Sequence, residues 1–150
     1  DFVVMDLIQT SSDTNYVCAA VHGVCHGMVG DNLPSRSDVV QLYKPRNIHA
    51  MRIYNPDQEA LAALRGSAIS LILDVRGVDE VRRLAGDPSY AASWVRSNVQ
   101  AYYPDVFIRY IAVGNEVPAG DTGIILPAMQ NVHNAWRLPT SPAASRCQRR

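Results

Sequence analysis

The sequence lacks an excess of charge of either sign, and it lacks any long apolar run. Lysine and arginine together number 14, as do aspartate and glutamate, so the formal net charge is zero. No basic field is available to hold a phosphate backbone, which argues against nucleic acid as the main partner. No apolar stretch approaches the roughly 20 residues that a bilayer requires, so we expect no membrane span.

Cysteine is scarce, and the usual metal and nucleotide signatures are missing. Cys18, Cys25 and Cys147 are odd in number, and their spacing predicts no disulfide framework, so their redox state stays open. Cys25 and His26 would point to opposite faces of a strand, and no Cys-x-x-Cys pair accompanies them, so we expect no metal site. Neither Gly-x-Gly-x-x-Gly after the first strand nor a Gly-Lys-Ser/Thr loop is present, so we expect no nucleotide cofactor.

What the sequence does contain is a strand pattern followed by a helix pattern, four times over. We expect strands at 21–25, 50–54, 69–75 and 107–113. The first two helices are expected at 35–43 or 37–43, with Ser35 or Ser37 as the cap, and from a cap at Asn55 to Gly66. Three more are expected at 78–85, from Asp87-Pro88 through Val99, and from Asp121 or Thr122 to Trp136. This alternation predicts parallel strands with helical crossovers, an α/β fold. Four units suit either an open sheet or half of an eight-fold barrel.

The two ends of the chain differ from this pattern, so we place the domain at residues 21–137. Residues 1–20 begin with Asp and carry the polar stretch 11–15, and they show no convincing signal peptide. We interpret them as a poorly ordered arm. Residues 138–150 are rich in Pro, Ser, Ala and Arg without periodicity, which predicts a disordered tail.

The segment 108–118 is where the sequence points most directly to chemistry. Residues 110–113 are almost continuously apolar, as in a strand buried on both faces of a parallel sheet. Gly114-Asn115-Glu116 follows, and the carboxyl ends of barrel strands carry catalytic residues. A partly buried Glu116 carboxylate would have a raised pKa, which suits a general acid. A solvated turn residue is the alternative, and these residues alone favour neither.

Several segments in the same order resemble one family. They are GVCHGM (23–28), DNLPS (31–35), VVQLY (39–43), MRIY (51–54), ALRGS (63–67), ASWV (92–95), YIAVGNEV (110–117) and LPAMQN (126–131). Together they resemble the N-terminal half of plant β-1,3-glucanases, glycoside hydrolase family 17, over roughly residues 21–135. The resemblance implies about four units of a (β/α)8 TIM barrel, retaining hydrolysis of β-1,3-glucan and no cofactor. It also implies secretion to the cell wall or delivery to the vacuole, with a role in defence or wall remodelling.

The resemblance also implies roles for three residues. Glu116 matches the proton donor, and Asn115 would hydrogen-bond a sugar hydroxyl beside the scissile bond. Tyr54, at the end of the second expected strand, matches an active-site tyrosine; a packed tyrosine at the top of the barrel is the alternative.

The sequence departs from the family pattern at the second carboxylate. Retaining hydrolysis needs two carboxyl groups roughly 5–5.5 Å apart, and the family's Ser-Glu-Ser/Thr-Gly-Trp-Pro nucleophile motif is absent. Asp74 is the obvious local substitute, although the family pattern gives it a structural or site-lining role. His26 stands where the family usually has Tyr, and the segment 76–78 replaces a loop that usually contains Pro-Asn.

We therefore expect a truncated, glucanase-like chain that lacks the nucleophile half and is inactive alone. The alternatives are a β-glucan-binding remnant and a non-functional truncated product. A half barrel has two free sheet edges, so we expect marginal stability or self-association through them.

Overall fold

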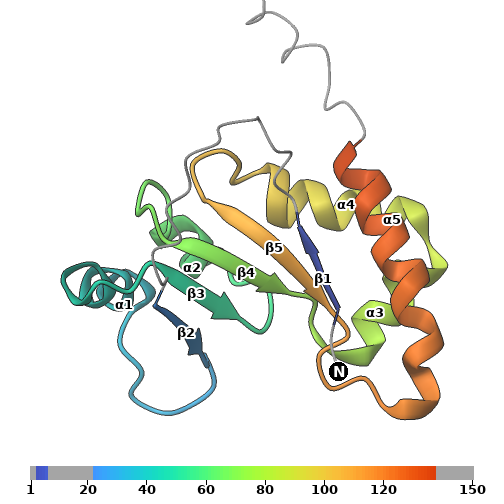
Figure 1. The fold of residues 1–150 in the computed structure, drawn as a ribbon, viewed down its shortest axis with the longest axis horizontal. Coiled ribbons are helices and arrows are strands. Elements are labelled where there is room, and N and C mark those ends of the chain that lie inside the picture. Colours follow the sequence, from blue (N-terminus) through green and yellow to red (C-terminus); the bar gives the residue numbers. More distant parts are fainter. Residues whose placement is uncertain (1–2, 7–21, 138–150) are drawn as a thin grey trace, which may run out of the picture.

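The computed structural model describes residues 3–6 and 22–137, which form one sheet with helices (Figure 1). The strands are β1 (Val3–Asp6), β2 (Gly23–His26), β3 (Ala50–Ile53), β4 (Ser70–Asp74) and β5 (Ile108–Val113), in the spatial order β1-β5-β4-β3-β2. Strands β2 to β5 are parallel neighbours, and β1 pairs antiparallel with the outer edge of β5. Within the described residues, the sheet does not close into a barrel.

Helical segments follow each of the four parallel strands. They are α1 (Arg36–Tyr43) with the short 3-10 helix η1 (Lys44–Arg46), α2 (Gln58–Ala63), α3 (Gly77–Gly86), α4 (Pro88–Val95) with the π-helix η2 (Arg96–Gln100), and the 3-10 helix η3 (Ala119–Ile124) with α5 (Ile125–Arg137). The alternation of parallel strands and helices expected from the sequence is confirmed. None of the helices in the described part of the chain is long and apolar enough to cross a membrane.

The core lies on one face of the sheet. Met51, Ile53, Leu71, Leu73 and Ile111 point to this face, are at most 3% exposed, and belong to one cluster with apolar side chains of α2, α3, α4 and α5. Figure 1 shows α3, α4 and α5 gathered on the side of β5, with α1 at the β2 edge. This burial of one sheet face against helices is the main apolar contribution to the fold.

The other face of the sheet is only partly covered. Cys25 is exposed, and Arg52, Ile72 and Tyr110, which follow one another across the strands in register, are half-buried. The expectation that the last strand is buried on both faces is therefore wrong at Tyr110. The physical reason is that the described helices pack on one face, and the sheet does not curl round to bury the other.

The N-terminal arm contains a strand that the sequence analysis did not expect. Backbone groups of Val3–Asp6 pair with β5, with Val3 opposite Val113 and Asp6 opposite Tyr110. An outer strand presents unpaired N–H and C=O groups, and β1 satisfies those of β5. The expectation of a poorly ordered arm is corrected for these four residues. Residues 1–2, 7–20 and the expected tail 138–150 lie outside the described residues.

The cap of α2 differs from the prediction. We expected Asn55 at the cap and Pro56 at the first helical position, but Asp57 is the cap residue, in extended conformation. Its Oδ1 accepts a hydrogen bond from the backbone N–H of Ala60 at 2.7 Å. Asn55 instead donates from Nδ2 to the carbonyl of Pro56 at 3.1 Å. The segment Asn-Pro-Asp-Gln offers two capping residues, and the later one satisfies the helix N–H group.

Other helix boundaries are confirmed or shifted. Ser35, one of the two expected cap residues, caps α1, and Asp87 caps α4 as predicted. The long helix expected through Val99 is α-helical only to Val95 and continues as the π-helix η2. The last helix begins at Ile125 rather than at Asp121 or Thr122, because the 3-10 helix η3 precedes it.

Candidate active site

Three polar side chains meet at the carboxyl ends of adjacent strands. Arg52 lies in β3, Asp74 is the last residue of β4, and Asn115 follows β5 by two residues. Arg52 Nε donates to both carboxylate oxygens of Asp74, at 3.0 and 3.1 Å, and its Nη2 donates to Asp74 Oδ2 at 2.5 Å. The same Nη2 donates to Asn115 Oδ1 at 3.1 Å. We call these residues the strand-end cluster.

The ion pair inside the strand-end cluster is removed from solvent. The side chain of Asp74 is 0% exposed and that of Arg52 is 13% exposed. Burial raises the pKa of the Asp74 carboxyl, and the Arg52 hydrogen bonds oppose that rise. The hydrogen bonds to Asp74 raise the pKa of Arg52, so Arg52 stays a cation. A bidentate, buried pair of this kind holds both side chains in one geometry.

Tyr54 borders the strand-end cluster. It is 38% exposed, and the Arg52 guanidinium carbon lies 4.9 Å from the centre of its ring. The neighbouring Cys25 thiol raises the pKa of Tyr54. Cys25 is an exposed free thiol, whereas Cys18 and Cys147 lie outside the described residues. The structure therefore places the predicted Tyr54 beside Arg52, with its ring partly accessible.

The turn that follows β5 carries Glu116 in an uncommon backbone conformation. Gly114 has φ of +99°, and a Cβ there would lie 2.8 Å from Ile125 Cδ1, so no larger residue fits without a shift. Glu116 itself has φ of +55°, and the N–H of Val117 donates to the Gly114 carbonyl at 3.3 Å. A non-glycine residue in this region is uncommon and often marks a functional site.

The Glu116 side chain is exposed, which corrects the expectation of a partly buried carboxylate. That expectation assumed apolar walls around the strand end. Within the described residues the sheet does not close into a barrel, so no opposite wall covers Glu116. The desolvation on which the general-acid argument depended is therefore missing at this residue.

The arrangement fixes how Asn115 can act. Because Arg52 has only donors, Asn115 must turn its carbonyl oxygen toward Arg52, and its Nδ2 donor points the other way. A donor beside an exposed carboxylate can hydrogen-bond a hydroxyl-rich ligand. Asp74, by contrast, is buried and bound by Arg52, so it is poorly placed to attack a substrate.

Sequence reasoning missed Arg52 as a member of the site. The signal was a charged residue in an otherwise apolar strand, Ala50–Ile53, which we had interpreted only as part of the resemblance.

His26, at the end of β2, lies apart from the strand-end cluster and contacts Tyr43, whose hydroxyl is 3.4 Å from Nδ1. Among the residues that the structure describes, no group of three His, Cys, Asp or Glu side chains could hold a metal ion.

Parallel strand–helix units with polar side chains gathered at the carboxyl strand ends are the arrangement of part of a (β/α)8 barrel enzyme. The family model described as Glycosyl hydrolases family 17 matches residues 22–140, and the chain belongs to this family. The family resemblance stated from the sequence is therefore confirmed.

Relatives and solved structures agree with this assignment. The chain is 90% identical over 116 residues to glucan endo-1,3-beta-glucosidase GV of Hordeum vulgare, covering 77% of this chain and 37% of that protein. It is 58% identical over 113 residues to isoform GII of the same plant, covering 75% of this chain and 34% of that protein. The chain thus spans about a third of the length of these curated relatives.

Two solved structures superpose with similar scores. One comes from a study of two plant beta-glucan endohydrolases with distinct substrate specificities, with a TM-score of 0.72 and 49% identity over 75% of this chain and 36% of that chain. The other is CJP38, a beta-1,3-glucanase and allergen of Cryptomeria japonica pollen, with a TM-score of 0.73 and 39% identity over 77% of this chain and 37% of that chain. The expected fold class, about four (β/α) units of an incomplete barrel, is confirmed, because the described residues form four parallel strands with alternating helices in a sheet that does not close.

Proposed function

We propose that this chain carries the general-acid side of an endo-β-1,3-glucanase site and binds β-1,3-glucan at the carboxyl ends of its strands. Glu116 donates the proton to the leaving oxygen, Asn115 donates a hydrogen bond to a sugar hydroxyl, and Tyr54 contacts the sugar. The single observation that supports this most is the bond from Arg52 to Asn115, which fixes the Asn115 amide next to Glu116 in a family 17 chain. The β-1,3 linkage is taken from the barley relatives, which are glucan endo-1,3-beta-glucosidases.

The chemistry of retention leads us to propose that the 150-residue chain binds glucan without hydrolysing it. Retaining enzymes need a nucleophilic carboxylate roughly 5–5.5 Å from the acid. The Asp74 carboxylate is 0% exposed and bound by Arg52. The nucleophile would come from the part of the relatives' length that this chain does not span. Binding without hydrolysis is therefore the function proposed for the 150-residue chain alone, and the exposed Glu116 and Tyr54 support it.

Hydrolysis is tested by reducing-sugar release from laminarin, a β-1,3-glucan. We expect the 150-residue chain to release no more sugar than Glu116→Gln, its isosteric control. Release that exceeds the control would overturn the proposal of inactivity. Joining the chain to the remaining barrel segment of the barley GV relative should create activity, and Glu116→Gln should then lower it by roughly 10²–10⁴-fold.

Binding is tested separately by electrophoresis through gels that contain laminarin. We expect laminarin to retard the 150-residue chain and the Glu116→Gln variant alike, because the isosteric change keeps the polar surface. Asn115→Ala should be retarded less, because it removes the proposed donor to sugar. Equal mobility with and without laminarin would contradict glucan binding and favour a non-functional product.

We further propose that the chain self-associates through its open sheet. β2 pairs only with β3 among the described strands, and Cys25, Arg52, Ile72 and Tyr110 lie on the incompletely covered face. Sedimentation velocity should show a dimer whose fraction rises with concentration. A monomer with one cooperative thermal transition would contradict this.

The resemblance to secreted and vacuolar glucanases leads us to propose a place outside the cytosol, at the cell wall or in the vacuole, with a role in defence or wall remodelling. Immunolocalisation in plant tissue tests this, and a purely cytosolic signal would contradict it.

A further inference from the structure

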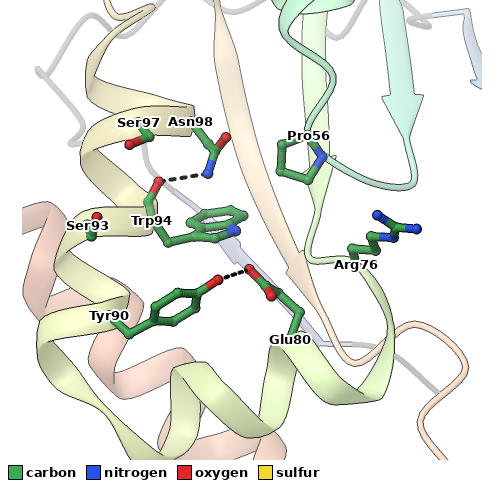
Figure 2. Close-up of a pocket in the computed structure, with 8 residues that line it drawn as sticks. All are labelled: Pro56, Arg76, Glu80, Tyr90, Ser93, Trp94, Ser97 and Asn98. Atoms are coloured by element: carbon green, nitrogen blue, oxygen red, sulfur yellow. Dashed lines mark hydrogen bonds between the residues drawn. The ribbon is translucent and has the colours of Figure 1, made fainter.

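A pocket of about 340 Å³ lies between the loop before α2 and the helices α3, α4 and η2 (Figure 2). Its walls come from Pro56 in that loop, Arg76 and Glu80 at the start of α3, and residues on one side of α4 and η2. The volume falls at the lower end of small-ligand pockets, roughly 300–1,000 Å³. None of its lining residues belongs to the strand-end cluster or is Tyr54 or Glu116.

The apolar walls of the pocket are held in place by neighbouring contacts. Trp94 is only 6% exposed, and its indole lies, in Figure 2, between Asn98 and the pair formed by Tyr90 and Glu80. The Tyr90 hydroxyl donates to Glu80 Oε1 at 2.7 Å, and the guanidinium carbon of Arg83 lies 4.0 Å from the centre of the Tyr90 ring. A ligand therefore meets a preformed aromatic wall rather than mobile rings.

Hydroxyl and amide groups line the side of the pocket formed by α4 and η2. Ser93 and Ser97 are exposed, four residues apart, and so lie one above the other on one helix face. Asn98 donates from Nδ2 to the Trp94 carbonyl at 2.9 Å, so its carbonyl oxygen faces the other way. Ser97 and Asn98 lie in the π-helix Arg96–Gln100, a distortion that is frequent at functional sites.

The two charged residues that line the pocket have opposite signs. Arg76 contributes one positive charge and Glu80 one negative charge, and both residues line the pocket. A strongly charged ligand would meet a like charge as well as an opposite one. A neutral ligand with several hydroxyl groups and one apolar face fits the serines, the amide and the aromatic wall together.

We propose that this pocket binds one sugar unit of a neutral saccharide, as a subsite separate from the strand-end cluster. The apolar face of the sugar packs on Trp94 and Pro56. Its hydroxyls hydrogen-bond to Ser93, Ser97 and the Asn98 carbonyl oxygen. The inference rests on the proposed function only in its choice of a β-1,3-linked probe.

The test uses NMR of the ¹⁵N-labelled 150-residue chain with laminaritriose as the probe. The chain has two tryptophans; Trp94 lines the pocket, and Trp136, which packs on Tyr103 with ring centres 5.3 Å apart, is the internal reference. Trp136→Phe assigns the two indole signals. We expect the Trp94 indole signal to shift saturably with laminaritriose, while the Trp136 signal stays in place.

The serine hydroxyls are tested with Ser93→Ala/Ser97→Ala, which keeps good helix formers on an exposed face. The loss of two hydrogen bonds should weaken binding at Trp94 by about tenfold or more. Ser89→Ala, on the same helix but outside the pocket, should leave the affinity unchanged. Ser93→Gln, which fills the pocket with a longer side chain, should also weaken binding and provides a second variant.

Three outcomes would overturn the proposal. They are no shift at Trp94 up to millimolar laminaritriose, an affinity unchanged in both serine variants, and tighter binding of inorganic phosphate than of the sugar. The proposed glucan function fails differently, because it predicts effects of Asn115→Ala on laminarin binding. Asn115→Ala should leave the Trp94 shift unaltered, so the two failures can be told apart.

Discussion

Replacing Arg52 with methionine should destabilise the protein strongly at neutral pH. Methionine keeps much of the unbranched stem but removes every hydrogen bond to Asp74 and the one to Asn115. The Asp74 carboxylate, which is 0% exposed, would then be a buried charge without its cation. The perturbation therefore tests whether this ion pair holds β3, β4 and the turn after β5 together.

The expected loss follows from the geometry. Removing one partner of a buried ion pair costs about 3–5 kcal/mol, and the lost bond to Asn115 adds about 1 kcal/mol. Asp74→Asn in the Arg52→Met background removes the unpaired charge and should restore about half of the loss. Urea unfolding followed by tryptophan fluorescence, at about pH 7, measures both values.

The destabilisation should also depend on pH with a definite sign. Burial already raises the pKa of Asp74, and the substitution removes the Arg52 interactions that oppose that rise. A carboxyl group with a raised pKa in the folded state contributes stability below its unfolded value, near 3.8, and loses it as pH rises through the folded value. The gap between Arg52→Met and the unaltered chain should therefore shrink as the pH falls from about 7 to about 4.5.

Two results would refute this reasoning. One is a loss below about 1 kcal/mol at neutral pH, which is within the range of ordinary surface substitutions. The other is a gap that stays constant with pH. The double variant is the control, because it has no carboxylate at residue 74 and should show no such narrowing.

Three further predictions rest on local geometry. Gly114→Ala should lower the free energy of unfolding by about 2 kcal/mol or more, because residue 114 has a positive φ and its new Cβ would press on Ile125. Gly120→Ala is the control: it has open space around it and should be nearly neutral in the same urea assay. Asp87→Ala removes the two hydrogen bonds that cap α4 and should lower the melting temperature through a loss of about 1 kcal/mol; an unchanged melting temperature would contradict the cap assignment. Burial lowers the pKa of His26 below 6.5, so its contribution to stability is present above about pH 6.5 and lost as pH falls through the lowered pKa. His26→Gln should therefore flatten the curve of stability against pH below about pH 6.5. Curves of the variant and the unaltered chain that run parallel would contradict this.

The parts of the fold that could be predicted are those that short-range sequence patterns determine. Apolar runs bounded by turns located all four parallel strands. Asp87 was recognised as a cap because it precedes a helix pattern with a suitable side chain, and the cap of the first helix was narrowed to Ser35 or Ser37, of which the structure selects Ser35. At Asn55-Pro56-Asp57, two capping residues fit the same pattern. The structure selects Asp57, whose Oδ1 accepts from the Ala60 N–H, while the Asn55 amide donates to the Pro56 carbonyl, and a local residue pattern does not distinguish these two outcomes.

The residues of the candidate site also separate into those that could be predicted from the sequence and those that could not. Asn115 and Glu116 could be located because polar residues directly after a buried strand must lie at its carboxyl end. The exposure of Glu116 could not be predicted, since it depends on how far the sheet curls around that end. Arg52 was missed because a charge within a short strand does not reveal its partner, and Asp74 lies on the next strand.

The antiparallel pairing of β1 with β5 has a consequence for assembly. A β-strand has one hydrogen-bonding edge on each side, and β4 already occupies the other side of β5. Backbone groups from Val3 to Asp6 fill the remaining side along residues 110–113. Any parallel strand that continues the barrel at this point must compete with β1 for the same N–H and C=O groups, so growth of the sheet there is a strand exchange rather than a simple addition.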